Sequence, residues 1–290
     1  MSSKDDSNTP KAWRELGQAL GGFARRVGKI VDDLQETARL PEEIRSQLDA
    51  LAGALAIENF DACARQLSEA GPVADWSVEL AGAAILTRLH CRLVEGELPP
   101  ELVEAIESRD DEALSERPET ALWRAYQALE RNEALECGDA LRRARRRREQ
   151  LTRRWADAFD DLASLIEGEA HLLGGYPQRA ERTLMTRLAR RGDFEGTRID
   201  LIFTERAVDV WLALDRVDAA QEHRARLEGQ IKRASKTEPD AGEDELDRAK
   251  ARAERFEASR PRLEALWARV DCARGDRSAA TVWLEAYDAQ

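Results

Sequence analysis

A pair of glycines ends one amphipathic pattern and a proline opens the next in the stretch 168–184, which reads GEAHLLGGYPQRAERTL. Glycine supplies the positive φ that ends many helices, and proline fixes φ in the first turn of a helix. The apolar residues before the glycines recur at helical spacing: Leu162, Leu165, Ile166, Ala170 and Leu173. The stretch therefore predicts a tight corner between two packed helices.

A phosphate-binding loop is the alternative that paired glycines raise. Such a loop follows a buried strand and carries a lysine that reaches the phosphates. Gly174 and Gly175 are instead followed by Tyr-Pro-Gln-Arg, and a helical pattern precedes them. We therefore interpret this stretch as a helical corner and not as a nucleotide site.

Similar corners recur along the chain. Asp215-Arg216, Gly275-Asp276 and Glu58-Asn59-Phe60 each separate two helical patterns. We take one residue after each corner as the equivalent position in successive hairpins. These residues are Cys63, Glu101, Cys137, Ala180, Ala220 and Ala280, with spacings of 38, 36, 43, 40 and 60 residues. The sequence thus indicates about six helical hairpins of unequal length.

The composition is typical of an all-α protein. Charged residues make up 35% of the 290 residues, only 9 residues are proline, and runs of β-branched residues, which strands need, are almost absent. A chain of this length buries a sizeable core, either as one elongated domain or as two small compact ones. A stack of hairpins corresponds to the elongated form.

The corner at residues 168–184 resembles the tetratricopeptide repeat (TPR) family. The family pattern has a small residue in the first helix, another twelve positions later, and a large apolar residue four positions after that. The spacings of this chain exceed the family's period of about 34 residues. Gly168, Ala180 and Leu184 match the pattern with Gly175 at the turn, while Val208, Ala220 and Arg224 match in part, as do Ala268, Ala280 and Leu284.

The resemblance implies a right-handed α-solenoid of about six antiparallel hairpins, because small residues let neighbouring helices approach closely. It also implies a non-enzymatic scaffold that binds a peptide or helix of a partner protein on its inner face, without a cofactor. In the family, contact residues come from the first helix of each hairpin. Carried over to this chain, they are Leu162, Leu165, Glu169, Leu172 and Leu173, and by a weaker alignment Glu205, Asp209 and Leu212.

A helical enzyme is the rival class, with Glu167, Glu169 and Asp209 meeting in a bundle interior. Carboxylates at helical spacing are common on any exposed helix, so this pattern is weak support for catalysis. The Asn and Lys clamp that some members of the repeat family use for a C-terminal carboxylate is not visible here.

Residues 11–38 form a second candidate surface, for which we expect an amphipathic helix. The glycines inside it each cost about 0.5–1 kcal/mol relative to alanine, so the helix depends on a packing partner. Three alternatives stay open: a cap on the first hairpin of the same chain, a contact with a partner's helix or a second copy in a homo-oligomer, and peripheral contact with an anionic membrane. The apolar seam consists of Trp13, Leu16, Leu20, Phe23, Val27, Ile30 and Leu34, and the basic residues are Lys11, Arg14, Arg25, Arg26 and Lys29.

A basic run interrupts a chain whose net charge is −12. We interpret it as a solvated helical surface, with docking of an acidic partner segment or of the chain's own acidic residues 237–245 as an alternative. Nucleic-acid binding is disfavoured because the surrounding charge is negative and no aromatic residues are interleaved. The run holds Arg142, Arg143, Arg145, Arg146, Arg147, Arg148, Arg153 and Arg154.

The remaining chemistry-bearing residues show no motif. The four cysteines are at least 28 residues apart with no CxxC pair, so we expect reduced core residues and neither zinc nor disulfides. His90, His171 and His223 lack the spacing of a metal or catalytic pair and are interpreted as ordinary helix residues. Of the seven tryptophans we expect about five in the core.

These observations predict five segments: a disordered start at 1–10, the amphipathic helix at 11–38, TPR-like repeats at 39–236, a flexible acidic loop at 237–245 and a C-terminal helical hairpin at 246–290. No apolar run approaches the length of a membrane span, and the polar, acidic start does not resemble a signal peptide. We therefore expect a cytoplasmic protein.

Overall fold

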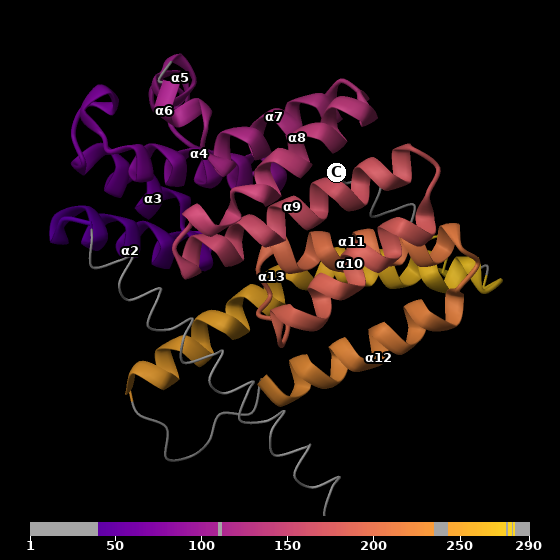
Figure 1. Cartoon of the computed structure of the whole chain (residues 1–290). Coiled ribbons are helices and arrows are strands. Elements are labelled where there is room, and N and C mark those ends of the chain that lie inside the picture. Colours follow the sequence, from indigo (N-terminus) through magenta and orange to yellow (C-terminus); the bar gives the residue numbers. More distant parts are fainter. Residues whose placement is uncertain (1–39, 110–111, 235–242, 277, 280, 282–290) are drawn as a thin grey trace, which may run out of the picture.

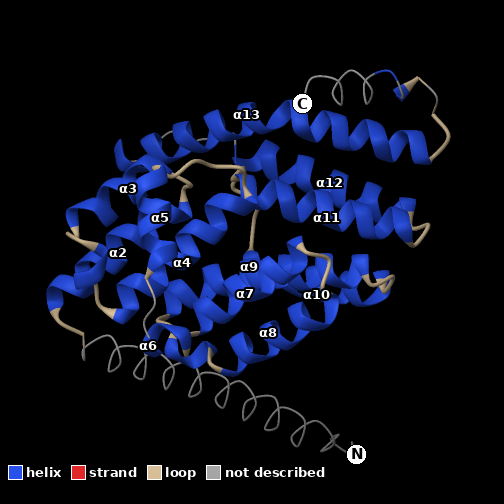
Figure 2. Ribbon diagram, turned by 90° about the horizontal axis from the view of Figure 1, so that it is seen from above, coloured by secondary structure: helices blue, strands red, loops and turns tan. Residues whose placement is uncertain are grey.

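A computed structural model describes residues 40–109, 112–234, 243–276, 278–279 and 281 of the chain (Figure 1). These residues form helices joined by corners and loops, and none of them lies in a β-strand (Figure 2). The all-α prediction is therefore confirmed.

The helices follow one another mostly as antiparallel pairs. α13 begins at Glu243, so the last residues of the segment predicted as an acidic loop, 237–245, are helical. The elements in chain order are α2 (Glu42–Ala56), α3 (Phe60–Glu69), the 3-10 turn η1 (Val73–Asp75), α4 (Val78–Leu93), α5 (Pro100–Ser108), α6 (Glu112–Ser115), α7 (Pro118–Glu130), α8 (Ala134–Arg146), the 3-10 turn η2 (Arg148–Gln150), α9 (Arg153–Leu173), α10 (Pro177–Arg191), α11 (Arg198–Ala213), α12 (Val217–Ala234) and α13 (Glu243–Ala273).

One hydrogen-bonded corner ends α2, α4, α7, α9, α11 and α13. Its central residue has a left-handed φ: 55° at Glu58, 55° at Glu95, 58° at Asn132, 74° at Gly175, 55° at Asp215 and 102° at Gly275. In each corner the next amide donates to the carbonyl five residues back, over 2.8–3.0 Å, as Tyr176 does to His171. This is the Schellman motif, which satisfies carbonyls at a helix end. The corners predicted at Glu58–Phe60, Gly174–Gly175, Asp215–Arg216 and Gly275–Asp276 are thus confirmed.

Small residues lie near the start of the second helix of a hairpin, just after the corner. Cys63, Cys137, Ala180 and Ala220, each five residues after the corner residue, are fully buried. A Cβ atom added at Gly168 would lie 2.9 Å from the side chain of Leu184, so only glycine fits there with this packing.

The second hairpin departs from this register. Glu101, aligned above with the small residues, is exposed, and its neighbour Leu102 is buried instead. The cause is the connection between α4 and α5, which is longer than the other corners because α5 starts only at Pro100. Ala280 lies outside the described residues.

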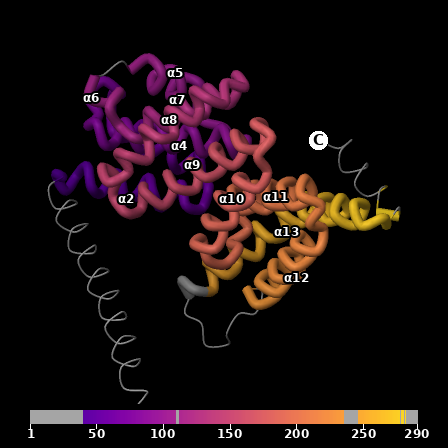
Figure 3. Tube along the Cα trace, turned by 45° about the vertical axis from the view of Figure 1, so that its right-hand side comes forward, coloured from indigo at the N-terminus to yellow at the C-terminus, as the bar shows by residue number. Residues whose placement is uncertain are grey.

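The first helices of successive hairpins contact one another in order: α2 with α4, α4 with α7, α7 with α9, α9 with α11, and α11 with α13. We call these six helices the first-helix layer. Second helices α3, α8, α10 and α12 each contact the first helix that follows. The layer also contacts itself across the stack, because α9 touches both α2 and α4. Figure 3 shows the helices up to α9 gathered beside the group α10–α13.

The described residues share two hydrophobic clusters. The larger one runs from α2 to α11, and the smaller one joins α11, α12 and α13 with Phe194 stacked on Phe256. Trp76, Trp155, Trp211 and Trp267 are buried, Trp123 is half-buried, and Trp13 and Trp283 lie outside the described residues.

Candidate functional site

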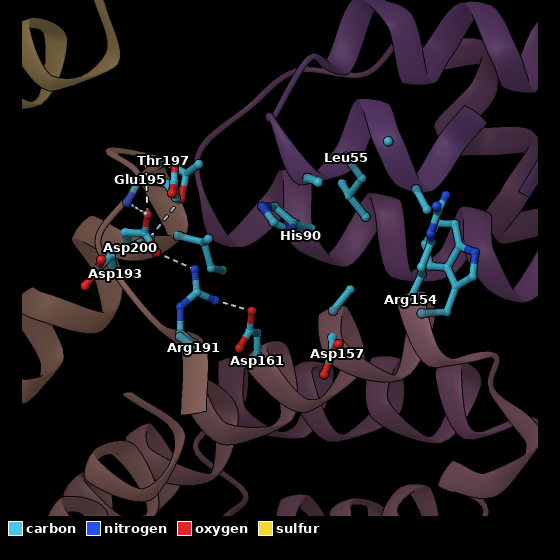
Figure 4. Close-up of a pocket in the computed structure, with 16 residues that line it drawn as sticks. Leu55, His90, Arg154, Asp157, Asp161, Arg191, Asp193, Glu195, Thr197 and Asp200 are labelled. Carbon is cyan, nitrogen blue, oxygen red and sulfur yellow. Dashed lines mark hydrogen bonds and ion pairs between the residues drawn. The ribbon is translucent and has the colours of Figure 1, made fainter. Parts of the chain in front are cut away.

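A cavity of about 550 Å³ lies where the first-helix layer contacts itself. Three stretches far apart in the sequence line it: 52–56 on α2, 154–161 on α9, and 191–200 from the end of α10 to the start of α11. His90 of α4 contributes a further wall (Figure 4). We call it the inter-hairpin cavity.

The α2 wall of the inter-hairpin cavity is apolar and consists of three small residues and Leu55. Ala52, Gly53 and Ala56 line it, and a Cβ atom added at Gly53 meets no atom within 4 Å. Opposite, Trp155 of α9 is 4% exposed, and its indole Nε1 is buried without a hydrogen-bond partner. A buried donor left unpaired costs about 1–3 kcal/mol, so this indole is a locally unfavourable group at the edge of the cavity.

A half-buried arginine, Arg191, joins the helices on the other side of the cavity. Arg191 at the end of α10 donates to Asp161 of α9 and to Asp200 of α11 (Figure 4). Arg187, one turn earlier, donates to Asp161 and, over 2.9 Å, to the carbonyl of Asp157. Burial lowers the pKa of Arg191, but the charges and hydrogen bonds of Asp161 and Asp200 raise it further, so the net pKa lies above its usual value. Three helices are therefore linked by one permanently charged guanidinium group.

Asp200 also shapes the loop that enters the cavity. Its Oδ2 accepts from the amides of Glu195 at 3.0 Å and Thr197 at 3.3 Å. The Thr197 hydroxyl accepts in turn from the Asp200 amide at 3.4 Å, which completes a capping box at the start of α11. The arginine network and the helix cap thus share one carboxylate.

A second buried carboxylate joins the first two hairpins to α11. The side chain of Glu58 accepts from the amides of Arg198 at 2.6 Å and Ile199 at 2.8 Å, and lies 3.2 Å from Nε2 of His90. Burial raises the pKa of Glu58, but the hydrogen bond and charge of His90 and the two amide donors lower it, so its pKa lies below the usual value. Arg198 donates to the carbonyl of Val94 at 3.2 Å. These contacts hold His90 and Ile199, which line the cavity, against each other.

The lining is acidic. Five carboxylates face two guanidinium groups, those of Arg154 and Arg191. Asp161 and Asp200 are paired with Arg191, and Asp157, whose side chain is 66% exposed, lies 3.9 Å from Arg187. The two remaining acids also have partners in the chain. Asp193 accepts from the side chain of Gln230 at 2.8 Å, and Glu195 pairs with Arg252 at 2.6 Å. Such a lining favours a cationic ligand with an apolar face.

None of the contact residues predicted on α9 lines the inter-hairpin cavity. Leu162 and Leu165 are buried in the larger core cluster, 0% and 4% exposed, so their side chains have no surface to offer a partner. Leu172 is half-buried, Leu173 is 54% exposed at the end of α9, and Glu169 forms an ion pair with Arg206 at 3.1 Å. The cavity is lined instead by the N-terminal part of this helix.

The contact residues predicted on α11 are occupied within the chain. Arg262 of α13 donates to both oxygens of Glu205, and Arg269 donates to Asp209. Leu212 is half-buried against the smaller core cluster. α13 therefore covers this face of α11.

The basic run is not one helix, contrary to our expectation. α8 ends at Arg146 and α9 begins at Arg153, with η2 between them. Most of its arginines pair with acids of the same chain, which agrees with a solvated surface. The pairs are Arg142 with Asp139, Arg145 with Glu167, Arg147 with Glu116, Arg148 with Asp160, and Arg154 with Asp49, while Arg143, Arg146 and Arg153 are exposed.

The predicted seam of residues 11–38 lies outside the described residues, and so do its members Trp13, Leu16, Leu20, Phe23, Val27 and Ile30. The second helix of the predicted C-terminal hairpin lies mostly outside them as well. Both remain predictions.

The cysteines are unpaired thiols. Burial raises the pKa of Cys63 to about 12 and those of Cys91 and Cys137 to about 11, which makes them poor nucleophiles. Among the described residues, no group of three or more His, Cys, Asp or Glu side chains is arranged to hold a metal ion.

The residues that build the cavity were missed by the sequence interpretation, although part of the signal was present. Asp157 and Asp161 are four apart on one helix of a hairpin, and Arg187 and Arg191 are four apart on the other. Such matched pairs predict ion pairs across a hairpin. The TRID sequence that ends at Asp200 is also a readable capping box. Glu58 offers no comparable signal.

No protein-family model matches the chain, and the comparisons found no significant match among curated proteins or solved structures. None of the helices formed by the described residues combines the length and apolar character that crossing a membrane requires. The function is therefore argued from the geometry of the cavity.

Proposed function

We propose that this chain is a non-enzymatic cytoplasmic scaffold, a right-handed TPR-like α-solenoid of about six hairpins that binds a peptide or helix of a partner protein. The recurring Schellman corner supports the repeat, because one backbone motif ends six successive first helices. The order of contacts in the first-helix layer also supports it. Unpaired buried thiols suit a reducing compartment.

The inter-hairpin cavity is the binding site in this proposal. It opens on the first-helix layer, which is the layer that TPR-like proteins use for their ligands. In this proposal its apolar wall, formed by Ala52, Gly53, Leu55 and Ala56, accepts a side chain or a helix face, and Asp157, which is 66% exposed and 3.9 Å from Arg187, presents a carboxylate to a basic group of the partner. The cavity is the single observation that carries the proposal.

Carboxylate-based catalysis has less support. Each acid of the rival hypothesis pairs with an arginine: Glu167 with Arg145, Glu169 with Arg206 and Asp209 with Arg269. These ion pairs engage the three carboxylates within the chain, and no arrangement of them around a common reacting centre supports catalysis.

Affinity capture with cavity variants tests the proposal. Gly53→Trp places a large ring on the wall of the inter-hairpin cavity, at a position where an added Cβ atom meets no atom within 4 Å, and we expect the ring to obstruct the cavity. Gly138→Trp on α8 is the matched control, because only the tip of Arg142 lies within 4 Å of its added Cβ atom. We expect one stoichiometric partner on the natural chain and on the control, and its loss with Gly53→Trp.

Two results would contradict the proposal. Equal recovery of the partner by all three chains would place binding outside the cavity. A stable dimer in solution that disappears when residues 11–38 are deleted, with no heterologous partner, would favour the homo-oligomeric structural protein instead.

A further inference from the structure

α10 directs its arginines to two different sides. Arg187 and Arg191 bind the carboxylates of α9 and α11. Arg179, Arg182 and Arg190 are exposed, and none of the three pairs with an acidic side chain of the described residues. They are separated by three and eight residues, which places them on one face of the helix. We call these three residues the basic stripe.

The basic stripe lies on a face without acids. The single acid of α10, Glu181, pairs over 2.6 Å with Arg216 in the corner between α11 and α12. The first turn of α10 holds no acidic residue, so the positive end of the helix dipole adds to the charge of the arginines. From Arg179 to Arg190 the stripe extends for about 17 Å. It is a positive surface on a chain whose net charge is −12.

Exposed apolar side chains continue from one end of the basic stripe. Leu173 and Tyr176, at the corner before α10, are 54% and 53% exposed. The guanidinium carbon of Arg179 lies 5.0 Å from the centre of the Tyr176 ring, so the stripe and this corner are in contact. Exposed apolar side chains beside charged ones are typical of a protein-binding surface. The stripe and the corner therefore form one surface with a charged part and an apolar end.

The charges of this surface select an acidic occupant. Guanidinium groups that have no acid of their own bind carboxylates through two parallel hydrogen bonds. A segment with carboxylates at the same helical steps reaches all three arginines, and an apolar side chain at its end contacts Leu173 and Tyr176. A long polyanion such as nucleic acid fits less well, because beyond the Debye length of about 10 Å it meets the negative charge of the remaining chain.

We propose that the basic stripe, together with Leu173 and Tyr176, is a docking surface for a short acidic segment of a partner protein that carries an apolar residue at one end. None of these residues lines the inter-hairpin cavity, so the surface is a separate site. The inference does not rest on the proposed function.

Fluorescence anisotropy with a labelled synthetic peptide tests the docking surface. The peptide carries leucine at one end and glutamate at every third or fourth position. Arg182→Glu combined with Arg190→Glu reverses the charge of the stripe. Arg143→Glu combined with Arg146→Glu is the matched control, because it makes the same change of charge at exposed arginines of the basic run on α8.

We expect the natural chain to bind the peptide, with an affinity that falls as salt is added. The stripe variant should bind at least about tenfold more weakly, and the control should differ by less than about twofold. Leu173→Ser combined with Tyr176→Ser should weaken binding by about threefold to tenfold, because the apolar end of the peptide loses its contact. Circular dichroism confirms that each variant keeps its helices.

Other outcomes overturn the proposal. No binding to the natural chain, or an equal loss in the stripe variant and the control, removes the stripe as the site. Tighter binding of a DNA duplex or of phosphatidylserine vesicles than of the peptide assigns the stripe to another polyanion. Gly53→Trp should leave peptide binding unchanged, and a loss there would place the peptide in the inter-hairpin cavity. Failure of the proposed function would instead appear as capture that is insensitive to Gly53→Trp.

Discussion

Two sets of arginines in this protein behave in opposite ways. Arg187, which is buried, and Arg191, whose side chain is 15% exposed, lie between α9, α10 and α11, where they bind carboxylates and a backbone carbonyl. The run from Arg142 to Arg154 is denser in charge, yet most of its members lie in solvent and pair with nearby acids. The sequence draws attention to the second set, whereas the first set builds the cavity.

The difference shows that burial, and not charge density, decides what an ion pair contributes. A buried charge that loses its partner leaves the other partner desolvated, while an exposed charge exchanges its partner for water. Buried ionisable groups at the junctions between hairpins should therefore dominate the stability of this protein and its dependence on pH.

The largest effect is expected from Arg191. Arg191→Ala leaves Asp161 and Asp200 buried with fewer donors and should lower the free energy of unfolding by about 3–5 kcal/mol. Arg146→Ala, an exposed member of the run, should change it by less than about 0.5 kcal/mol. Urea unfolding at pH 7 measures both. A loss below about 1 kcal/mol for Arg191→Ala would abolish the distinction between the two sets.

His223 should produce the largest pH dependence. Burial, together with the charge of Arg226, lowers its pKa from 6.5 to about 4. Between these values the unfolded chain binds the proton and the folded chain does not, so stability falls as the pH drops from 6.5 to 4. The total loss should be about 3 kcal/mol. His223→Gln should lack this part of the pH profile, and an unchanged slope in urea titrations would show that His223 is not responsible.

Glu58 should have a smaller effect with a different pH range. Glu58→Gln weakens the acceptor for the amides of Arg198 and Ile199 and should cost about 1–2 kcal/mol at pH 7. The folded pKa of Glu58 lies below 4.5, so its contribution is present above pH 4.5 and is lost as the pH falls through the folded value. The variant and the natural chain should therefore converge in acid. Thermal unfolding between pH 7 and pH 3 tests this, and a constant difference would be inconsistent with the charge of Glu58 as the cause.

The smallest effect on the free energy of unfolding is expected from a substitution in the basic run from Arg142 to Arg154. Arg142→Ala removes an exposed pair with Asp139, whose side chain is 53% exposed, and should change the free energy of unfolding by less than about 0.5 kcal/mol. Added salt should remove even that difference, because solvent-exposed charges are screened. A larger loss would mean that the run packs against part of the chain.

The helical corners were predictable because their causes are local. A positive φ at Gly175 or Asp215 and the hydrogen bond to the carbonyl five residues before the next amide involve one short stretch of chain. The exact register was harder to predict, as the exposed Glu101 shows. There a longer connection shifts the helix, and one residue of shift turns a buried position outward.

The contact surface was not predictable in the same way. Glu205 and Asp209 look like exposed acids on the first helix of a hairpin until α13 covers them with Arg262 and Arg269. Leu162 and Leu165 belong to the apolar pattern of α9, and that pattern does not tell a core face from a ligand face.

The amino-acid sequence by itself determined the all-helical class, four of the corners and the small residues Cys63, Cys137, Ala180 and Ala220 that close four hairpins, because these depend on interactions within a few residues. Only the tertiary structure decided where the cavity lies, since its walls come from α2, α9 and α11, and Glu58 reaches across 140 residues to the amide of Arg198. Contacts at that distance follow from how all the intervening hairpins pack, and no local pattern encodes them.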